Sequence, residues 1–233
     1  MRAVRPAAAE MAVELWLVRH GQAAFATEDY DRLTDLGRQQ AVWLGEHLAA
    51  MGVVFDRIAA GTLRRQQETA QAIAGVLGGS VETVDGLEEY DSDRLLEAHG
   101  YTASQRGGDA DQRREHFQRL RAALMAWAAG HIEGAESWEA FDARIRAAVA
   151  RLTAGAASGN GGRVLAASSG GAIAMALTQV LGIGVEKMVE FNLQARNTGI
   201  TRLVFTKRTV YFNMFNAIPH LERPERQHAE TYS

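Results

Sequence analysis

An arginine, a histidine and a glycine follow one another directly after the apolar run VELWLV at residues 13–18. Charged and polar side chains at the end of a buried strand are costly unless they have partners or a function. The planar guanidinium of Arg19 suits a phosphate group, and the imidazole of His20 can act as a neutral nucleophile near neutral pH. Gly21 lets a backbone N–H approach an anion closely, and Gln22 is a weaker candidate contact. Alone, these residues fit a basic loop with an ordinary histidine just as well.

A second arginine, Arg65, lies in the first turn of a helix that we expect to follow Gly61, with Thr62 as its capping residue. A cation at this end of a helix is opposed by the helix dipole. A bound anion would reverse that penalty, and helix N-termini bind phosphate readily. We therefore expect Arg65 to face an anion, with its neighbour Arg64 directed to solvent. Thr62 is a weaker candidate contact.

Two serines lie at a third strand-to-helix junction, in the stretch VLAASSGGAIAMAL at residues 164–177. The apolar residues before the serines indicate a buried strand, the glycines a tight turn, and the residues after them a helix. A helix that begins here presents backbone N–H groups to an anion. Ser169 and Gly170 are therefore candidate phosphate contacts.

Strands that alternate with helices must position these three junctions. Strands are predicted at residues 13–18, 53–60, 81–84, 163–168, 199–205 and 209–215. This pattern predicts an α/β fold, a three-layer sandwich with a mostly parallel central sheet and helices on both faces. Ligands of such sheets bind at the carboxyl ends of the strands. We therefore expect the junctions at residues 18–22, 60–65 and 167–171 to meet at one edge of the sheet.

Two further helical patterns bear on the fold. Thr34 is positioned to cap a helix that ends at Gly52, with Leu36, Leu44 and Leu48 on one face. Residues 93–160 are rich in charge and alanine and show no strand pattern. There, apolar residues recur at helical spacing from Phe117 to Trp127 and from Trp138 to Leu152, and most simply they belong to the core. We interpret this region as a helical insertion that covers the site.

Composition narrows the class of protein. The chain has 233 residues, a formal net charge of −3 and no cysteine. The charge does not suggest a nucleic-acid-binding protein, and no apolar run approaches the roughly 20 residues of a membrane span. The absence of cysteine excludes disulfides and thiolate chemistry, and no metal-binding spacing such as His-Glu-x-x-His occurs. These features favour a cytoplasmic protein without nucleic-acid or membrane partners.

The chain length suits one domain, which we place at residues 12–221. Residues 1–11 contain arginines and alanines but no clean apolar segment with a cleavage site, so we interpret them as a loose leader, with Met11 a plausible true start. Residues 222–233 are expected to form a solvated tail.

Several motifs in a fixed order are similar to those of a known family. They are LVRHGQ (17–22), LTDLGRQQA (33–41), AGTLRRQQETA (60–70), GLEEYD (86–91), AESWEAFDARIRAAVARL (135–152) and RNTGITRLVF (196–205). Together they resemble the histidine phosphatase superfamily, whose members include the phosphoglycerate mutases. The resemblance covers residues 13–221. Each motif alone is weak, but their combination in this order is specific.

The resemblance implies a mechanism that needs no metal or other cofactor. His20 would attack the phosphorus of a small phosphorylated substrate and form a phosphohistidine, which water then hydrolyses. Arg19 and Arg65 would hold the phosphoryl oxygens. An acid must protonate the leaving oxygen and later activate water. Glu89 matches the family position best, through the Leu-x-Glu spacing, and Glu88 is the alternative.

The chain departs from the family pattern at two places. The resemblance predicts a histidine at position 169, where it would donate to the phosphoryl group and add positive charge, but the chain has Ser169. Loss of one such donor typically costs about 10²–10³ in rate. The strand, the turn and the helix around Gly170 remain, so we still expect an anion pocket. The stretch AAFATEDYD (23–31) does not resemble the mutases, which favours a phosphatase.

Two other classes of function stay open. The first is a phosphate-binding regulatory protein with little or no turnover, which Ser169 supports. The second is a serine hydrolase that uses Ser169, because AASSGG contains Ala-x-Ser-x-Gly, close to the nucleophile elbow of α/β-hydrolases. That fold needs an acid and a histidine downstream, where Glu186, Glu190 and His220 are available. This interpretation leaves the other two junctions without a role.

Overall fold

A six-stranded sheet forms the centre of the protein, whose computed structural model describes residues 12–24, 31–101, 110–155 and 161–232. The strands are β1 Val13–Arg19, β2 Arg57–Ala60, β3 Val81–Thr83, β4 Gly162–Ser168, β5 Ile200–Phe205 and β6 Val210–Ala217. They lie in the order β3-β2-β4-β1-β5-β6. Strands β1 to β4 pair in parallel, whereas β5 pairs antiparallel with β1, and β6 antiparallel with β5. This largely parallel sheet confirms the predicted α/β class.

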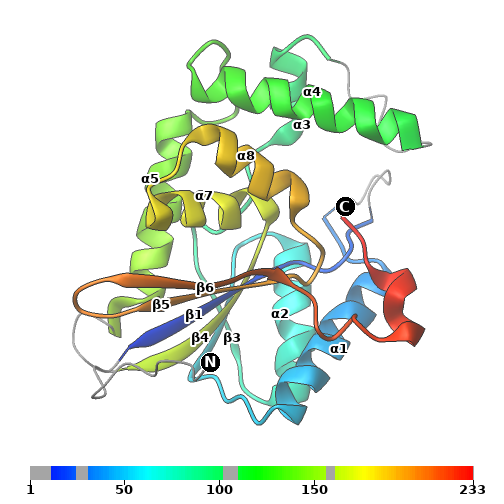
Figure 1. Ribbon diagram of the computed structural model, residues 1–233, viewed down its shortest axis with the longest axis vertical. Coiled ribbons are helices and arrows are strands. Elements are labelled where there is room, and N and C mark those ends of the chain that lie inside the picture. Colours follow the sequence, from blue (N-terminus) through cyan, green and yellow to red (C-terminus); the bar gives the residue numbers. More distant parts are fainter. Residues whose placement is uncertain (1–11, 25–30, 102–109, 156–160, 233) are drawn as a thin grey trace, which may run out of the picture.

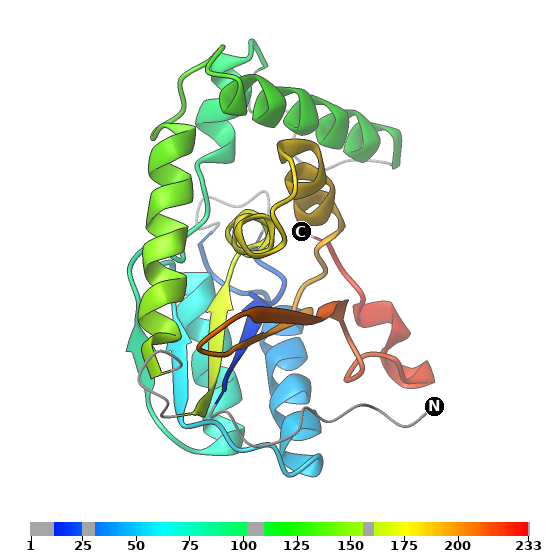
Figure 2. The same cartoon turned by 60° about the vertical axis from the view of Figure 1, so that its left-hand side comes forward.

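Helices lie on both faces of the sheet, as Figures 1 and 2 show. Helices α1 and α2 cover one face, and α5 and α7 cover the other, with α8 beside α7. The helices are α1 Asp35–Ala50, α2 Arg64–Leu77, α3 Ser92–Ala98, α4 Ala110–Ala128, α5 Trp138–Leu152, α7 Gly170–Leu181 and α8 Val185–Gln194. Within the described ranges, no helix is long and apolar enough to cross a membrane.

Strand β1 is mostly apolar, which fits its place between β4 and β5 with helices covering both faces of the sheet. Its side chains alternate between the two layers of the core. Leu15 and Leu17 belong to the larger core cluster with Phe141 of α5, whereas Trp16 and Val18 pack in the cluster under α1 and α2. Burial of each such side chain contributes about 1.5–3 kcal/mol, so a shift of one residue in register would be costly.

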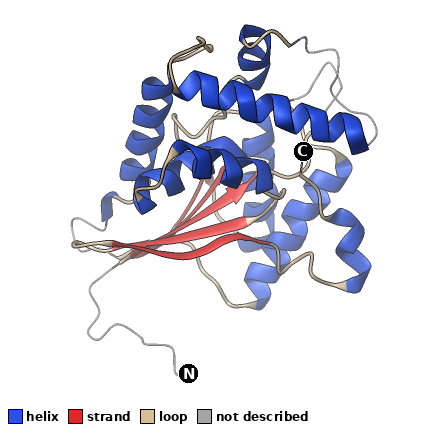
Figure 3. Cartoon of the chain, turned by 45° about the horizontal axis from the view of Figure 1, so that its top comes forward, coloured by secondary structure: helices blue, strands red, loops and turns tan. Residues whose placement is uncertain are grey.

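Residues 93–160 form helices in their described part, as predicted, but not in every detail. Helix α3 lies at the start of this region, where the sequence predicted no individual helix. The apolar stripe of α5 is buried as expected, and Trp127 of α4 packs edge-on against Trp138 at 5.1 Å between ring centroids. Phe117 is an exception, because it is 36% exposed at the outer side of α4. Helix α4 packs against α3 and α8, in the helical layer above the sheet in Figure 3.

The C-terminal residues are bound to the domain rather than fully solvated. Residues Pro224–Ala229 form a short 3₁₀ helix whose last residue is buried, although most neighbouring side chains are exposed. The amide of Gln40 in α1 donates to the carbonyl of Ala229 at 2.6 Å and to the hydroxyl of Thr231 at 2.9 Å. Leu36 packs against this C-terminal region rather than with Leu44 and Leu48, which corrects the predicted face of α1. The predicted leader, residues 1–11, lies outside the described residues.

Candidate active site

His20 follows the last residue of β1 and is almost fully buried. Its Nδ1 lies 2.8 Å from the carbonyl of Gly21, which can only accept, so Nδ1 carries the proton. Its Nε2 is therefore unprotonated and accepts a hydrogen bond from Nε of Arg65 at 3.2 Å. Burial, and then the charges of Arg65 and Arg19, hold the pKa of His20 well below its ordinary value. The imidazole is neutral near neutral pH, with Nε2 available as a nucleophile.

Gly21 and Gln22 position the histidine rather than face the site. The N–H of Gly21, which was expected to approach an anion, donates to the hydroxyl of Thr69 at 3.0 Å. A Cβ on Gly21 would lie 2.3 Å from the carbonyl oxygen of Gly37, so the loop and α1 touch through two glycines. The side-chain oxygen of Gln22 accepts from Thr34, the capping residue of α1, at 2.9 Å. These contacts fix the backbone on which His20 stands.

Arg65 is held against His20 by a carboxylate that the sequence analysis missed. The guanidinium of Arg65 pairs with Asp31 at 2.7 Å between Nη1 and Oδ1. The other oxygen of Asp31 accepts from the backbone N–H of Arg64 at 2.9 Å, so Asp31 satisfies the first turn of α2. Thr62, the predicted cap, makes no such bond, and the capping position falls on Leu63. The carboxylate of Asp31, rather than a bound ligand, therefore offsets the charge of Arg65 in this first turn.

Arg19 lies at the end of β1 beside the C-terminal segment. Its Nη1 donates to the carbonyl oxygen of Tyr232 at 3.1 Å and also to that of Ala195. Burial, the largest cause for each group, lowers the pKa of His20 and raises that of Glu89. The charge of Arg19 adds a smaller lowering to both pKa values. Arg19 therefore lies close enough to share one electrostatic environment with these two side chains.

The two candidate acids point in different directions. The carboxylate of Glu88 turns back and accepts from the N–H of Gly86 in its own loop at 2.8 Å. The carboxylate of Glu89 accepts from the N–H of Gly171 at 2.9 Å, in the first turn of α7. Burial raises the pKa of Glu89, while the Gly171 N–H and the charges of Arg65 and Arg19 oppose that shift. Glu89 is therefore the glutamate that lies with the histidine and the arginines.

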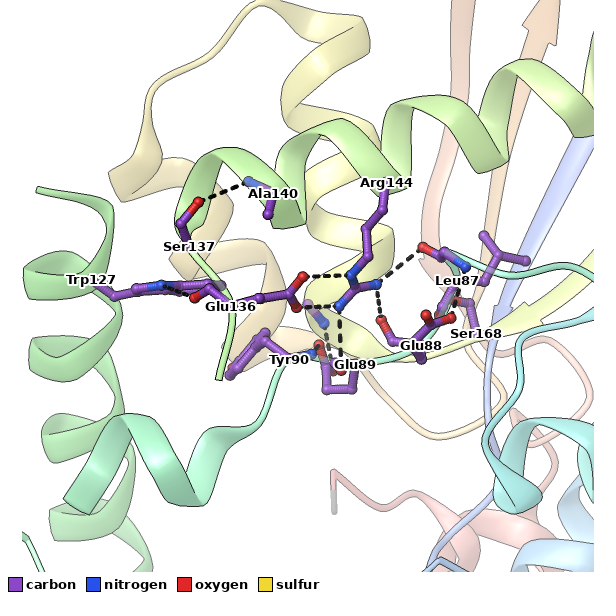
Figure 4. Close-up of polar contacts among 12 residues, drawn as sticks. Leu87, Glu88, Glu89, Tyr90, Trp127, Glu136, Ser137, Ala140, Arg144 and Ser168 are labelled. Atoms are coloured by element: carbon purple, nitrogen blue, oxygen red, sulfur yellow. Dashed lines mark hydrogen bonds and ion pairs between the residues drawn. The ribbon is translucent and has the colours of Figure 1, made fainter. Parts of the chain in front are cut away.

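Arg144 of α5 holds the loop that carries both glutamates (Figure 4). Its Nη1 donates to the carbonyl of Gly86 at 3.1 Å and to that of Glu88 at 2.7 Å. The same guanidinium forms two hydrogen bonds with the carboxylate of Glu136, at 2.8 and 2.6 Å. The sequence gave no signal for this role, because an arginine on a helix surface is usually solvated. Arg144 fixes the backbone from which Glu89 extends.

Ser169 and Gly170 lie at the start of α7, next to the end of β4, and both are buried. The hydroxyl of Ser169 does not cap its helix but accepts from Nε2 of Gln66 at 2.8 Å. The preceding hydroxyl, on Ser168, donates instead to the carbonyl of Leu87 at 2.7 Å. Gln66 is a further residue that the sequence analysis missed, although it directly follows Arg65.

The predicted site residues thus separate into two groups. The structure brings together Arg19, His20, Arg65, Glu89 and Ser169 at the carboxyl ends of β1, β2 and β4, where ligands of such sheets bind. Gly21 and Gln22 instead bond to Thr69 and Thr34, and Thr62 is exposed. A neutral histidine between two arginines, with a buried carboxyl group opposite, can transfer a phosphoryl group through a covalent intermediate.

Comparison with known proteins decides the family. The family model for the histidine phosphatase superfamily (branch 1) matches residues 15–218. The chain belongs to this superfamily.

Individual members of the histidine phosphatase superfamily give further context. Serine/threonine-protein phosphatase Pgam5 of Drosophila grimshawi is 42% identical over 59 residues, which are 24% of this chain and 20% of the relative. The match thus spans about a fifth of that relative's length. A mycobacterial glucosyl-3-phosphoglycerate phosphatase is 25% identical, with a TM-score of 0.64 over 88% of this chain and 99% of the other. Phosphoglycerate mutase of Bacillus anthracis is 21% identical, with a TM-score of 0.63 over 91% and 96%, and shares the fold.

His220 does not supply a second histidine to this histidine phosphatase site. Its Nε2 lies 2.7 Å from the hydroxyl of Thr198, and the N–H of Thr198 donates to the carbonyl of Arg19 at 3.0 Å. Burial, followed by the charges of His47 and Arg226, lowers the pKa of His220 to about 3. A neutral His220 thus supports the backbone behind the site.

Proposed function

We propose that this chain is a phosphatase that hydrolyses small phosphomonoesters through a phosphohistidine on His20. The observation that carries the proposal is the pair of contacts on its imidazole. Because Nδ1 is bound to the carbonyl of Gly21, Nε2 is the unprotonated, nucleophilic nitrogen, and it accepts a hydrogen bond from Nε of Arg65 at 3.2 Å. Family membership and the phosphatase names of relatives support the same class of reaction.

In the first step, Nε2 of His20 forms a bond to phosphorus while the bond from phosphorus to the ester oxygen breaks. Arg19 and Arg65 hold the phosphoryl oxygens as charge develops on them. Glu89, with its raised pKa, gives its proton to the leaving oxygen. Its carboxylate then takes a proton from water, which attacks phosphorus, releases phosphate and restores His20.

The substrate is expected to lie partly under the helical insertion, residues 93–160, which we propose shapes its choice. Helix α5 contributes Arg144 to the loop that holds Glu89, so the insertion and the site are physically connected. A phosphatase is favoured over a mutase because the stretch at residues 23–31 does not resemble the mutases.

The proposal is tested by turnover of p-nitrophenyl phosphate by the wild type and by His20→Ala. We expect measurable hydrolysis by the wild type and its loss in the variant. His131→Ala is a matched control, since this histidine lies in the turn after α4, away from the site. Hydrolysis unaffected by His20→Ala would overturn the mechanism.

A second candidate function is a phosphate-binding protein with little turnover. The uncharged Ser169 at a position where the resemblance predicts a histidine favours it. Isothermal titration of inorganic phosphate, beside the turnover assay, separates the two candidates. Phosphate binding that His20→Ala retains, without turnover in the wild type, would support this second function.

The structure speaks against the third interpretation, a serine hydrolase. The hydroxyl of Ser169 bonds to Gln66, and His220 bonds to Thr198, so this serine and histidine do not form a catalytic pair. Covalent labelling of Ser169 by a fluorophosphonate would revive this interpretation.

A further inference from the structure

Ser169 and Gln66 form a buried polar pair inside the candidate site. Both side chains are fully buried, one at the start of α7 and the other in the first turn of α2. The atom of Gln66 that faces Ser169 also faces the carbonyl of Leu87, at 3.0 Å. A carbonyl only accepts, so that atom is the amide nitrogen, and it donates one hydrogen to Leu87 and the other to Ser169.

The direction of this bond determines what the serine can do. Since Oγ of Ser169 accepts from Gln66, its own hydrogen is left to be donated elsewhere. Within the described part of the chain, no residue accepts a hydrogen bond from this hydroxyl. A buried donor without an acceptor is unfavourable, and a ligand oxygen would satisfy it.

The location of Ser169 indicates which kind of ligand oxygen would accept a hydrogen bond from its hydroxyl. The carbonyl of Ser168, the residue before Ser169, accepts from the backbone N–H of His20 at 2.8 Å, so the two strand ends meet here. On the other side of Ser169, the N–H of Gly171 donates to the carboxylate of Glu89. A phosphoryl group attached to or attacked by His20 would therefore present an oxygen to this hydroxyl.

We propose that Gln66 orients the hydroxyl of Ser169 so that it donates to the transferred phosphoryl group. Ser169 is then a catalytic residue, and Gln66 is a positioning residue that acts through it. The pair supplies, without charge, the donor that the family resemblance predicts from a histidine. This inference rests on the proposed phosphatase function.

A double-mutant cycle tests the pair, with kcat and KM for p-nitrophenyl phosphate as readouts. Ser169→Ala is expected to lower kcat about 10²-fold, the usual cost of one donor to a developing oxyanion. Gln66→Met keeps the volume but removes the donor, and is expected to lower kcat about 10-fold with little change in KM. The double variant should be no worse than Ser169→Ala alone, because Gln66 acts through the serine.

The next glutamine serves as a matched control. Gln67→Met changes a side chain that bonds to Gly61 and Thr83. It should keep kcat within about twofold. Losses that multiply in the double variant would indicate a structural role for Gln66 and would overturn the proposal, as would an unchanged kcat in Ser169→Ala.

A histidine introduced at position 169 gives a second, independent test. Its imidazole would need the space of the Gln66 amide, which lies 2.8 Å from the serine oxygen. We expect Ser169→His alone to lower kcat and the added change Gln66→Ala to restore it at least to the wild-type value. An equal kcat for Ser169→His with and without Gln66→Ala would contradict the expectation that the imidazole and the Gln66 amide compete for the same space.

Failure of the inference can be told from failure of the phosphatase function. If His20-dependent turnover exists but the cycle shows no coupling, only the role of the pair is wrong. If the wild type shows no His20-dependent turnover, the phosphatase function itself is wrong. Titration of inorganic phosphate then tests the pair alone, and an affinity unchanged by Ser169→Ala would overturn it.

Discussion

The candidate site has two halves that differ in the charge they offer to a phosphoryl group. The β1–β2 half, Arg19, His20 and Arg65, contributes two guanidinium groups, and each bonds to an oxygen of the chain itself. The second half, Glu89, Ser169 and Gln66, contributes a carboxyl group and neutral donors. On the proposed mechanism, the first half supplies the nucleophile and the positive charge, and the second supplies the proton donor and the uncharged hydrogen-bond donors.

The largest expected effect comes from the β1–β2 half. Arg65→Ala removes the guanidinium beside Nε2 of His20, and kcat/KM should fall about 10³-fold. Arg65→Lys should recover only a part, because an ammonium keeps the charge but loses the planar fork. The control is Arg64→Ala, whose guanidinium is largely exposed and pairs with Glu68. Similar losses at both arginines would contradict the assignment.

The second effect tests the second half of the site, through Glu89, and depends on the leaving group of the substrate. Glu89→Gln removes the proton donor, so kcat should fall about 10²-fold with an alkyl phosphate and less with p-nitrophenyl phosphate, whose leaving group needs little protonation. Glu88→Gln is the matched control, because that carboxylate faces its own loop. Equal losses for the two substrates would show that Glu89 is not the acid.

The pH dependence of the wild type follows from the two pKa shifts. The lowered pKa of His20 keeps the nucleophile unprotonated well below pH 6.5, so activity should persist into mildly acidic solution. Because the pKa of Glu89 is raised above its ordinary value of 4.5, its carboxyl group stays protonated to higher pH. Activity should fall as the pH rises through this raised pKa. We expect Glu89→Gln to remove the alkaline decline. A decline that persists in this variant would assign it to another group.

A smaller effect tests how the acid is positioned. Arg144→Met releases the loop of Glu89, and kcat should fall about 10-fold. The same change leaves the carboxylate of Glu136 unpaired and should lower the free energy of unfolding by about 2 kcal/mol. Arg146→Met, which breaks an exposed pair with Asp142, should change neither. Denaturant unfolding and kcat, measured together, separate stability from positioning.

The smallest effect sharpens the account of the β1–β2 half. Asp31 neutralises Arg65 and satisfies the first turn of α2. Asp31→Asn keeps an oxygen for the helix but removes the charge, so inorganic phosphate should inhibit about threefold more strongly. Asp35→Asn, an exposed first-turn residue of α1, is the control. Weaker phosphate inhibition in Asp31→Asn would show that Asp31 aids binding rather than competing with it.

Local patterns predicted most of the fold, and together with the family resemblance they indicated the candidate residues of the site. The apolar run at β1 must be a central strand, and the motif that follows it places Arg19 and His20 at the end of that strand. What the sequence did not reveal depends on contacts between distant residues. Asp31 reaches α2 across 33 positions to the N–H of Arg64, and Arg144 reaches the loop at Glu88 across 56. Neither contact produces a periodic pattern in the sequence that could have revealed it.

The two short helices α3 and α8 were missed for a different reason. Each has ten residues or fewer, which is too short for a clear amphipathic repeat, and each is stabilised by packing against longer helices. The predicted solvated tail failed in the same way, because Ala229 is buried by a surface of α1 that only the folded protein provides.

The central claim is that His20 carries the phosphoryl group during turnover. Rapid acid-free quenching of the wild type with excess p-nitrophenyl phosphate, followed by peptide mass spectrometry, tests it most directly. The account predicts one phosphoryl group on His20, stable in alkali and labile in acid, and none in His20→Ala. Turnover with no phosphorylated His20 at any quench time, or with the label on Ser169, would contradict it.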